Sequence, residues 1–389
     1  MARLALVNAR LVTADAVVDG GLLVEDGRIA AAGPSVEAPP DAGVLDLGGR
    51  YLAPGFVELH THGGGGHSFL TEDPAEVEAY ARWVASRGVT SFLIGVASGE
   101  HERTLRVLRG SAAFFERPPS VGARALGYFL EGPFLSPRRK GAFSEAWLRP
   151  PNVDQFRQYV EATGGRLRLL TLAPELPGAD ALIAAALEVG AVPSMGHSDA
   201  TYEEALHSFE VGISHVTHCF NAMRPLAHRD PGCLGAALTT PSVTCELILD
   251  GSHVDPAAAA LLVRAKGVDG TVLVTDAIPP AGSERETVEW EGMKAKVVGK
   301  AAVREDGTII GSLATADDLV RHAVKWLPVT LAEAVRMVTR NPARVLRLEE
   351  GKGSLVAGTD ADLVVLDDEL RVAMTVVRGQ IVYRRSDIL

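Results

Sequence analysis

Short apolar runs alternate with amphipathic segments through the middle of this chain. A short apolar run bounded by turn residues is typical of a buried strand, whereas apolar side chains three and four positions apart indicate a helix. Helical spacing marks, among others, residues 75–88, 181–190 and 201–212. The strand candidates are 56–62, 89–96, 123–134, 167–175, 191–197, 213–220, 243–254 and 271–278. These eight strand and helix units predict a closed (β/α)8 barrel over residues 56–348.

The two ends of the chain carry a different pattern, with apolar runs broken by turn sequences such as Glu25-Asp26-Gly27 and Arg378-Gly379. This pattern is typical of β-hairpins. Neither end has enough strands for a stable core of its own. Residues 1–55 and 349–389 are therefore expected to pair into one small β-sandwich domain beside the TIM-like barrel, in an α/β fold. Residues 286–311 also alternate, and we expect a hairpin insertion there.

Composition narrows the range of partners. Hydrophobic residues make up 47% of the 389 residues and charged ones 22%, which suits a globular chain with a large core. The net charge of -11 argues against nucleic acid or an anionic membrane as the main partner, because both require a basic surface. An anionic ligand would need a local cationic pocket.

The cellular compartment is indicated by the N-terminus and by the cysteines. Asn8 and Arg10 interrupt the first apolar run, so we interpret it as a strand rather than a signal peptide. No stretch approaches the roughly 18 apolar residues of a membrane-spanning helix. Three cysteines, Cys219, Cys233 and Cys245, are an odd number, which favours buried thiols in a reducing compartment. We expect a cytoplasmic location.

Most predicted barrel strands end in a side chain that can bind a metal ion or transfer a proton. These side chains are His60, His62, Glu131, His197, His218, His253 and Asp276. The carboxyl ends of barrel strands converge on one mouth, where active sites lie. In His60-Thr61-His62 the two-residue period of a strand sends both imidazoles to the same side. Imidazole and carboxylate ligands favour zinc or a neighbouring divalent transition metal, so the sequence predicts a metal site.

Several motifs at these strand ends resemble a known family. They are Glu131-Gly132-Pro133-Phe134, Lys140-Gly141-Ala142, Gly196-His197-Ser198, Thr217-His218, Asn221-Ala222-Met223, Asp250-Gly251-Ser252-His253 and Thr275-Asp276-Ala277. Together with His60-Thr61-His62 they resemble the amidohydrolase superfamily and, within it, the N-acetylglucosamine-6-phosphate deacetylases. The resemblance runs over nearly the whole chain. Members that carry a carboxylated lysine on the fourth strand fit less well, because residues 167–175 contain no lysine.

The resemblance implies a metal-dependent hydrolysis of N-acetylglucosamine 6-phosphate to glucosamine 6-phosphate and acetate, in amino-sugar catabolism. Glu131, His197 and His218 would hold the metal ion common to the family. His60 and His62 match members with a second ion, so one or two divalent ions per subunit are expected, with zinc as the expected element. Asp276 would act as general base and then as general acid.

The resemblance also implies the residues that bind the phosphorylated amino sugar and a homodimeric assembly. Arg229 matches a phosphate-binding arginine, of the subunit's own site or of a neighbour's, and an arginine can clamp phosphate with two donors. His253 and Ala142 would contact the ligand. The backbone of Asn221 and Ala222 and that of Ile309, Ile310 and Gly311 would line the sugar pocket.

One position departs from the family pattern. Phe143 follows Lys140-Gly141-Ala142 where the family has a histidine that contacts the sugar. A phenyl ring cannot hydrogen-bond a hydroxyl group, so substrate identity is more open than the chemistry. An amidohydrolase that acts on another N-acetylhexosamine phosphate or on a different small amide is the first alternative. A metal-binding or sugar-sensing protein without catalysis is the second, and His215, which points away from His218 along the same strand, is interpreted as structural.

Overall fold

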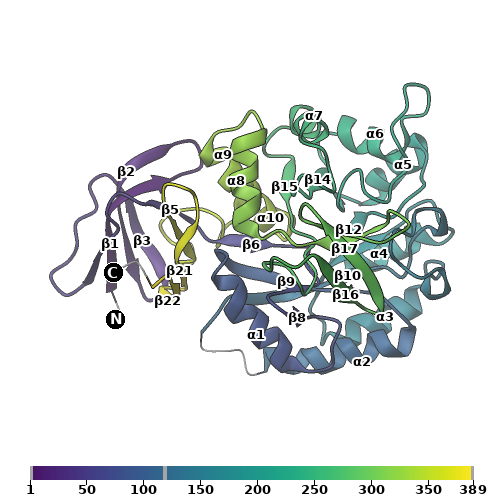
Figure 1. Ribbon diagram of the computed structural model, residues 1–389, viewed down its shortest axis with the longest axis horizontal. Coiled ribbons are helices and arrows are strands. Elements are labelled where there is room, and N and C mark those ends of the chain that lie inside the picture. The colour runs from purple at the N-terminus through teal and green to yellow at the C-terminus, as the bar shows by residue number, and fades with distance from the viewer. Residues whose placement is uncertain (1–2, 117–120, 387–389) are drawn as a thin grey trace.

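The computed structural model describes residues 3–116 and 121–386. The first two and the last three residues of the predicted β domain therefore lie outside the described part of the chain. A small sheet that contains both termini lies at one end of the molecule, and a larger body of parallel strands and helices lies at the other (Figure 1). Helices α8 and α9 lie between the small sheet and the rest of the larger body in this view.

Parallel strands form the centre of the larger body, in the order β15-β14-β13-β12-β11-β10-β9-β6. Their bounds are β6 Phe56–Glu58, β9 Val89–Ala97, β10 Arg124–Glu131, β11 Leu167–Leu172, β12 Val192–Met195, β13 His215–Val216, β14 Thr244–Leu247 and β15 Thr271–Leu273. Beyond the two edge strands, the Asp276 amide donates to the His60 carbonyl over 2.9 Å and closes the ring. The predicted parallel barrel is confirmed.

Several barrel strands are shorter than the sequence pattern predicts. The apolar run 213–220, for example, forms only the two-residue strand β13. Residues of these runs that follow the strands, such as 217–220, leave the strand ladder at the mouth of the barrel. An apolar run therefore predicts burial here, and only part of it becomes strand.

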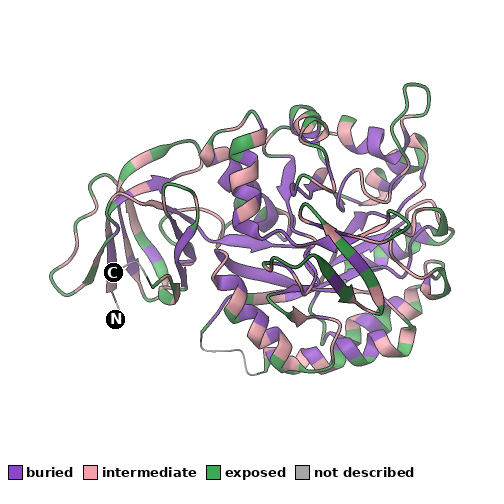
Figure 2. Cartoon of the chain, in the orientation of Figure 1, coloured by how far each residue is buried: buried purple, intermediate pink, exposed green. Residues whose placement is uncertain are grey.

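Helices surround the parallel strands and bury one face each (Figure 2). Their bounds are α1 Pro74–Ala85, α2 His101–Ala112, α3 Val153–Ala162, α4 Ala179–Glu188, α5 Tyr202–Val211, α6 Gly232–Thr239, α7 Pro256–Lys266, α8 Ala316–Trp326, α9 Leu331–Val338 and α10 Arg340–Val345. The short 3-10 helices are Ala113–Phe115, Pro137–Arg139 and Glu145–Trp147. Local sequence determines where the α-helices begin and end. In α5, for example, the Thr201 side chain forms a capping box with Glu204, and the helix ends at Gly212.

The small sheet is built from both ends of the chain, as predicted. Its strands are β1 Arg3–Val12, β2 Val17–Glu25, β3 Arg28–Gly33, β4 Gly43–Asp46, β5 Tyr51–Pro54, β20 Leu363–Leu366, β21 Val372–Val377 and β22 Gln380–Arg384. Strand β20 pairs antiparallel with β5, so the C-terminal hairpin extends the N-terminal strands. The sheet has an apolar core of its own, which includes Leu6, Leu22 and Leu363. The domain boundaries after residues 55 and 348 stay predictions.

The insertion predicted as a hairpin forms an antiparallel meander of the strands β16 Thr287–Trp290, β17 Met293–Val298, β18 Ala301–Val303 and β19 Ile309–Ser312. Its last strand is joined to the barrel, because the Ser312 amide donates to the Asp276 carbonyl over 2.9 Å. The meander therefore lies at the barrel mouth. A smaller hairpin of β7 Gly63–Gly64 and β8 His67–Ser68 follows the first barrel strand.

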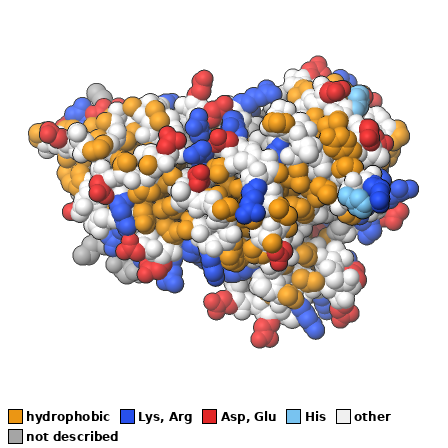
Figure 3. Space-filling view, turned by 90° about the horizontal axis from the view of Figure 1, so that it is seen from above, with side chains coloured by type: hydrophobic (Ala, Val, Ile, Leu, Met, Phe, Trp, Pro, Cys, Tyr) orange, Lys and Arg blue, Asp and Glu red, His pale blue; other side chains and the backbone are white. Residues whose placement is uncertain are grey.

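In the described residues, every helix is too short or too polar to cross the hydrocarbon core of a bilayer. On the face shown in Figure 3, lysine and arginine side chains are interspersed with aspartate and glutamate and do not merge into one basic surface. This distribution agrees with the net charge of -11.

We predict that Gly95→Ala destabilises the barrel. A Cβ at this position would lie 2.0 Å from the Thr61 carbonyl oxygen, so β9 must move away from the residues that follow β6. The expected loss is about 1–3 kcal/mol in the free energy of unfolding, as for other overpacked interiors. Urea unfolding measures it. The control is Gly43→Ala, whose Cβ would meet its nearest atom at an ordinary 3.7 Å. Equal stability of both variants would contradict the prediction.

Candidate active site

Six of the predicted side chains meet at the mouth of the barrel. They are His60, His62, Glu131, His197, His218 and Asp276. Glu131 is the last residue of β10, whereas His60, His197 and His218 each lie two residues beyond their strands. Residues up to 216 positions apart in sequence are thereby brought into one buried cluster.

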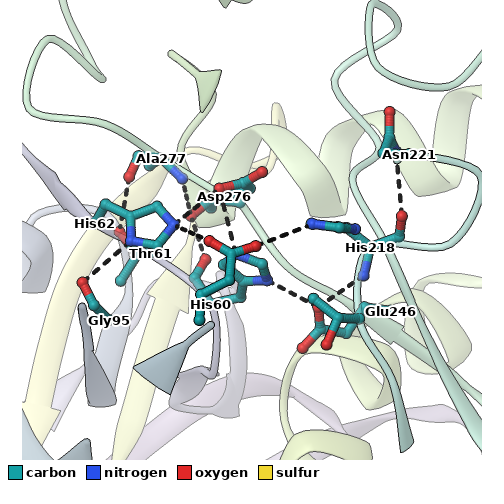
Figure 4. A network of polar contacts seen from close by, with 12 residues as sticks. His60, Thr61, His62, Gly95, His218, Asn221, Glu246, Asp276 and Ala277 are labelled. Carbon is teal, nitrogen blue, oxygen red and sulfur yellow. Dashed lines mark hydrogen bonds and ion pairs between the residues drawn. The ribbon is translucent and has the colours of Figure 1, made fainter. Parts of the chain in front are cut away.

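The cluster divides into two groups of possible metal ligands. Glu131 Oε1 lies 3.1 Å from Nε2 of His197 and 3.1 Å from Nε2 of His218. Asp276 Oδ1 lies 3.3 Å from Nε2 of His60 and 3.4 Å from Nε2 of His62. The second oxygen of Glu131 is 3.2 Å from His62, so this carboxylate lies between the two groups. Figure 4 shows the imidazoles of His60, His62 and His218 turned toward this common centre.

Hydrogen bonds at the far nitrogen orient three of these imidazoles. Nδ1 of His60 donates to Glu246 over 2.9 Å, Nδ1 of His62 to the Gly95 carbonyl over 3.1 Å, and Nδ1 of His197 to the Arg139 carbonyl over 2.9 Å. Each ring therefore directs its Nε2 toward the cluster. Metal-binding histidines in proteins are typically held in this way.

The donor set fits a divalent metal ion. Nε2 of His60 is buried without a hydrogen-bond partner, and Nε2 of His197 lies 3.1 Å from Nε2 of His218. Buried polar atoms of this kind cost free energy unless a further group satisfies them. Imidazole nitrogens mixed with carboxylate oxygens are ligands that zinc and its neighbours accept. The residues present therefore suit one or two such ions.

A buried carboxylate supports the cluster from below. Glu246 on β14 lies 2.9 Å from Nδ1 of His60 and 3.0 Å from Nε2 of His215, and it accepts the backbone amide of His218 over 2.9 Å. His215 thus contacts Glu246 rather than the metal ligands, as its structural interpretation predicts. A second carboxylate, Glu58, accepts the backbone amide of His60 over 2.9 Å, and burial raises its pKa to about 7.

Several residues of the site have left-handed backbone conformations. The φ angles are +48° for His197, +28° for His218 and +48° for Asp276, and Ala222 has +49°. Residues other than glycine adopt this region at a cost of about 1 kcal/mol or more each. The strand ends therefore turn sharply just where the ligand-bearing residues sit, which aims their side chains across the mouth.

Electrostatics keep the two central carboxyl groups ionised. Burial favours the neutral form of Asp276, but the neighbouring imidazoles of His60 and His62 outweigh it and hold the pKa of this carboxyl well below its usual range. For Glu131, burial acts in the same direction, and hydrogen bonds from surrounding imidazoles again lower the pKa. Both carboxyl groups therefore favour the anionic form, which can bind cations.

A cavity of about 270 Å³ opens above the cluster. The predicted ligand-contacting residues that line it are Ala142, Phe143, Asn221, Ala222, His253, Ile309, Ile310 and Gly311. His253 is oriented by Asp250, whose Oδ2 lies 2.7 Å from Nδ1, and this contact raises the pKa of His253 although burial opposes it. The other nitrogen of this ring is left to meet a ligand.

Two predicted positions behave differently from the rest. Arg229 is exposed on the loop between β13 and α6 and is not among the residues that line the cavity. Phe143 lines the cavity, but its ring packs edge-on against His197 with centroids 5.1 Å apart. The phenyl ring therefore packs against a metal-ligand candidate in addition to lining the cavity.

The sequence interpretation missed several residues of this site. Glu246 is a charged residue inside an apolar strand, and this pattern could have identified it from the sequence. Asp250 was noticed only as part of a motif. Trp147, Trp290 and Arg103 also line the cavity. They come from loops and from the inserted meander, whose position above the mouth cannot be deduced from spacing.

Comparison with known proteins gives the family of this chain. The model of the amidohydrolase family matches residues 51–382. The chain belongs to the amidohydrolase family. This amidohydrolase is 32% identical over 386 residues to the N-acetylglucosamine-6-phosphate deacetylase of Bacillus subtilis, with 98% of the chain and 97% of the relative covered.

Two further relatives bear on the substrate. A solved variant of N-acetyl-D-glucosamine-6-phosphate deacetylase from Mycobacterium smegmatis, in complex with N-acetyl-D-glucosamine-6-phosphate, has a TM-score of 0.90 at 33% identity, with 98% of this chain and 100% of that chain covered. The N-acetylgalactosamine-6-phosphate deacetylase of Escherichia coli O157:H7 is 33% identical, with 96% of the chain and 97% of the relative covered. Relatives of this amidohydrolase therefore include deacetylases named for two epimeric sugars.

We predict that Glu246→Gln weakens metal binding. The amide cannot accept from His60, His215 and the His218 backbone with the same geometry and charge, and removal of such supporting carboxylates lowers metal affinity by about 10–100-fold. Competition with a chelator measures the affinity. Glu289→Gln, at an exposed position of β16, is the control and should bind metal like the wild type. Unchanged affinity in Glu246→Gln would refute the supporting role.

Proposed function

We propose that this chain hydrolyses the acetamide of N-acetylglucosamine 6-phosphate and releases acetate and glucosamine 6-phosphate. The observation that supports this most directly is the position of Asp276. Its ionised carboxylate lies within 3.4 Å of two metal-ligand candidates, at the floor of a cavity large enough for a small ligand.

The metal chemistry is part of this proposal. Glu131, His197 and His218 would hold one ion, and His60 and His62 would hold a second with Glu131 shared between them. Zinc is the proposed element, because nitrogen and oxygen ligands of this kind suit it. When bound, a divalent ion supplies Lewis acidity, which activates water near neutral pH and polarises an amide carbonyl.

Asp276 has two successive roles in the proposed reaction. Its carboxylate accepts a proton from the attacking water, which adds to the acetyl carbon. The protonated carboxyl then donates to the sugar nitrogen as the carbon–nitrogen bond breaks, because an amine leaves readily only when it is protonated. A cation held by His60 and His62 beside Asp276 would favour the ionised form of this carboxyl before substrate arrives.

The sugar would be held by groups on the opposite side of the cavity. His253, fixed by Asp250, would hydrogen-bond the ligand near the reacting amide. Backbone groups of Asn221, Ala222 and Ile309–Gly311 would contact hydroxyl groups and the phosphate. Phe143 would present a ring to the sugar instead of a hydrogen bond, so the galactosamine epimer is a second candidate substrate.

The phosphate requires a cation, and we propose that Arg229 supplies it in a homodimer. Arg229 lies outside the cavity of its own chain in the described structure. A loop that misses its own site and carries an arginine can serve a neighbouring one. The cavity then becomes complete only when two subunits associate.

A cytoplasmic location fits the proposed function. Cys219, Cys233 and Cys245 are buried and unpaired thiols, as expected in a reducing compartment. Phosphorylated sugars are retained within cells by their charge.

The first test is acetate release from N-acetylglucosamine 6-phosphate by metal-stripped protein, before and after addition of zinc. N-acetylgalactosamine 6-phosphate and unphosphorylated N-acetylglucosamine are assayed in parallel. We expect turnover only with metal and at least tenfold higher kcat/KM with a phosphorylated sugar, since a lost charged contact costs about 1.5–3 kcal/mol. Asp276→Asn should lower kcat by about 10²–10⁴-fold.

Three outcomes would count against the proposed reaction. Metal binding without cleavage of any of these sugars would move the substrate search to other small amides. Equal turnover of the unphosphorylated sugar would remove the phosphate from the recognised part of the substrate. Full activity of Asp276→Asn with its metal retained would remove this carboxylate from the mechanism.

Complementation between two variants tests whether Arg229 acts in the site of its own subunit or in that of its neighbour. Arg229→Ala should raise KM with little change in kcat, and Asp276→Asn should be inactive. After the two variants are mixed and reassembled, a hybrid dimer would contain one intact site. Random pairing should then restore about a quarter of the wild-type activity at low substrate concentration. If mixing restores nothing, Arg229 acts in its own chain or not at all.

A further inference from the structure

The β16–β17 hairpin covers one side of the cavity, and the proposed roles above do not use it. Trp290 is the last residue of β16, and its ring stacks on His62 with centroids 5.8 Å apart and planes inclined by 30°. It pairs across the hairpin with Met293, and both residues line the cavity. The indole therefore forms a wall directly beside a predicted metal ligand.

An ion pair holds this wall in place across the cavity. Glu291 and Gly292 form the tight turn of the hairpin, with φ angles of +51° and +73°. The Glu291 carboxylate pairs with Arg103 in the first turn of α2. A Cβ at Gly99 would lie 3.8 Å from Arg103 and 3.9 Å from Trp147, so the indole of Trp147 lies near Arg103.

Apolar and aromatic side chains form part of the cavity lining, among them Leu70, Ala97, Trp147, Trp290 and Met293. Polar groups that suit a sugar, including His253 and Asn221, also line it. The Trp290 ring lies beside His62, which belongs to the cluster at which the amide would react. The acyl methyl is the apolar end of such a substrate, so an indole beside the reacting amide suits it.

We propose that Trp290, held by the Glu291–Arg103 ion pair, determines which acyl group the enzyme removes. This inference rests on the proposed deacetylation and adds a specificity-determining residue to it. The indole occupies the space that a longer acyl chain would need, so the acetyl group is preferred. Removal of the ring, or release of the hairpin that carries it, enlarges the acyl site without replacing Asp276 or any of the metal-ligand candidates.

The test compares kcat/KM for N-butyrylglucosamine 6-phosphate with kcat/KM for N-acetylglucosamine 6-phosphate. Trp290→Ala should raise this ratio at least about tenfold, because a single methylene group in an apolar pocket changes discrimination by about 10–200-fold. Trp290→Phe keeps an aromatic ring and removes an indole nitrogen that is buried without a partner, so it should fold well and raise the ratio less. Arg103→Met should also raise the ratio, because it releases the hairpin.

Arg304→Met is the matched control. It breaks the Arg304–Asp306 ion pair, 3.2 Å long, in the same meander but at a turn that does not line the cavity, so the ratio should stay as in the wild type. An unchanged ratio in Trp290→Ala would overturn the inference. If that variant does not fold, an unchanged ratio in both Trp290→Phe and Arg103→Met would overturn it. Wild-type protein that cleaves neither substrate would instead refute the proposed deacetylation.

Discussion

The site depends on one buried negative charge, the Glu246 carboxylate. It contacts His60 from the first barrel strand, His215 on the sixth and the backbone of His218, with distances of 2.9–3.0 Å. A buried carboxylate without partners would be prohibitively unstable, so Glu246 needs these three donors. The donors in turn are held in place by the carboxylate. His60 follows the first barrel strand, His215 lies on the sixth and His218 follows it, so Glu246 links the ends of strands that are not neighbours in the sheet. The positions of His60 and His218, both metal-ligand candidates, depend on this link.

The same logic explains why strain is concentrated at the mouth. His197, His218 and Asp276 take left-handed backbone conformations, which a side chain disfavours. Straight continuation of each strand would place these side chains alternately inside and outside the barrel wall. A sharp turn at the strand end directs them toward one point instead. The large apolar interior of the barrel stabilises the fold sufficiently for a few residues to be held in unfavourable conformations.

Sequence patterns could predict the parallel barrel and the residues at its strand ends, because both follow from local periodicity. The apolar run 213–220 could not reveal that only His215 and Val216 form a strand, since most of its other residues are buried as well. Glu246 could have been noticed as a charge within an apolar run. The wall formed by Trp290 could not, because it depends on how an inserted meander folds back over the barrel. Arg229 matches a family position, yet spacing gives no indication that it lies away from its own cavity.

In this acidic protein the proposed phosphate site needs a positive charge that the lining of the cavity does not offer freely. Among the described residues that line the cavity, Arg103 is the single lysine or arginine, and Glu291 already neutralises it. A phosphorylated sugar therefore finds little free positive charge among the described residues that line the cavity. Arg229 is exposed on its loop and does not line this cavity. If that loop completes a neighbouring site, affinity for the phosphate becomes a property of the dimer, and dissociation of the subunits would weaken substrate binding while the hydrolytic groups of each chain stay intact.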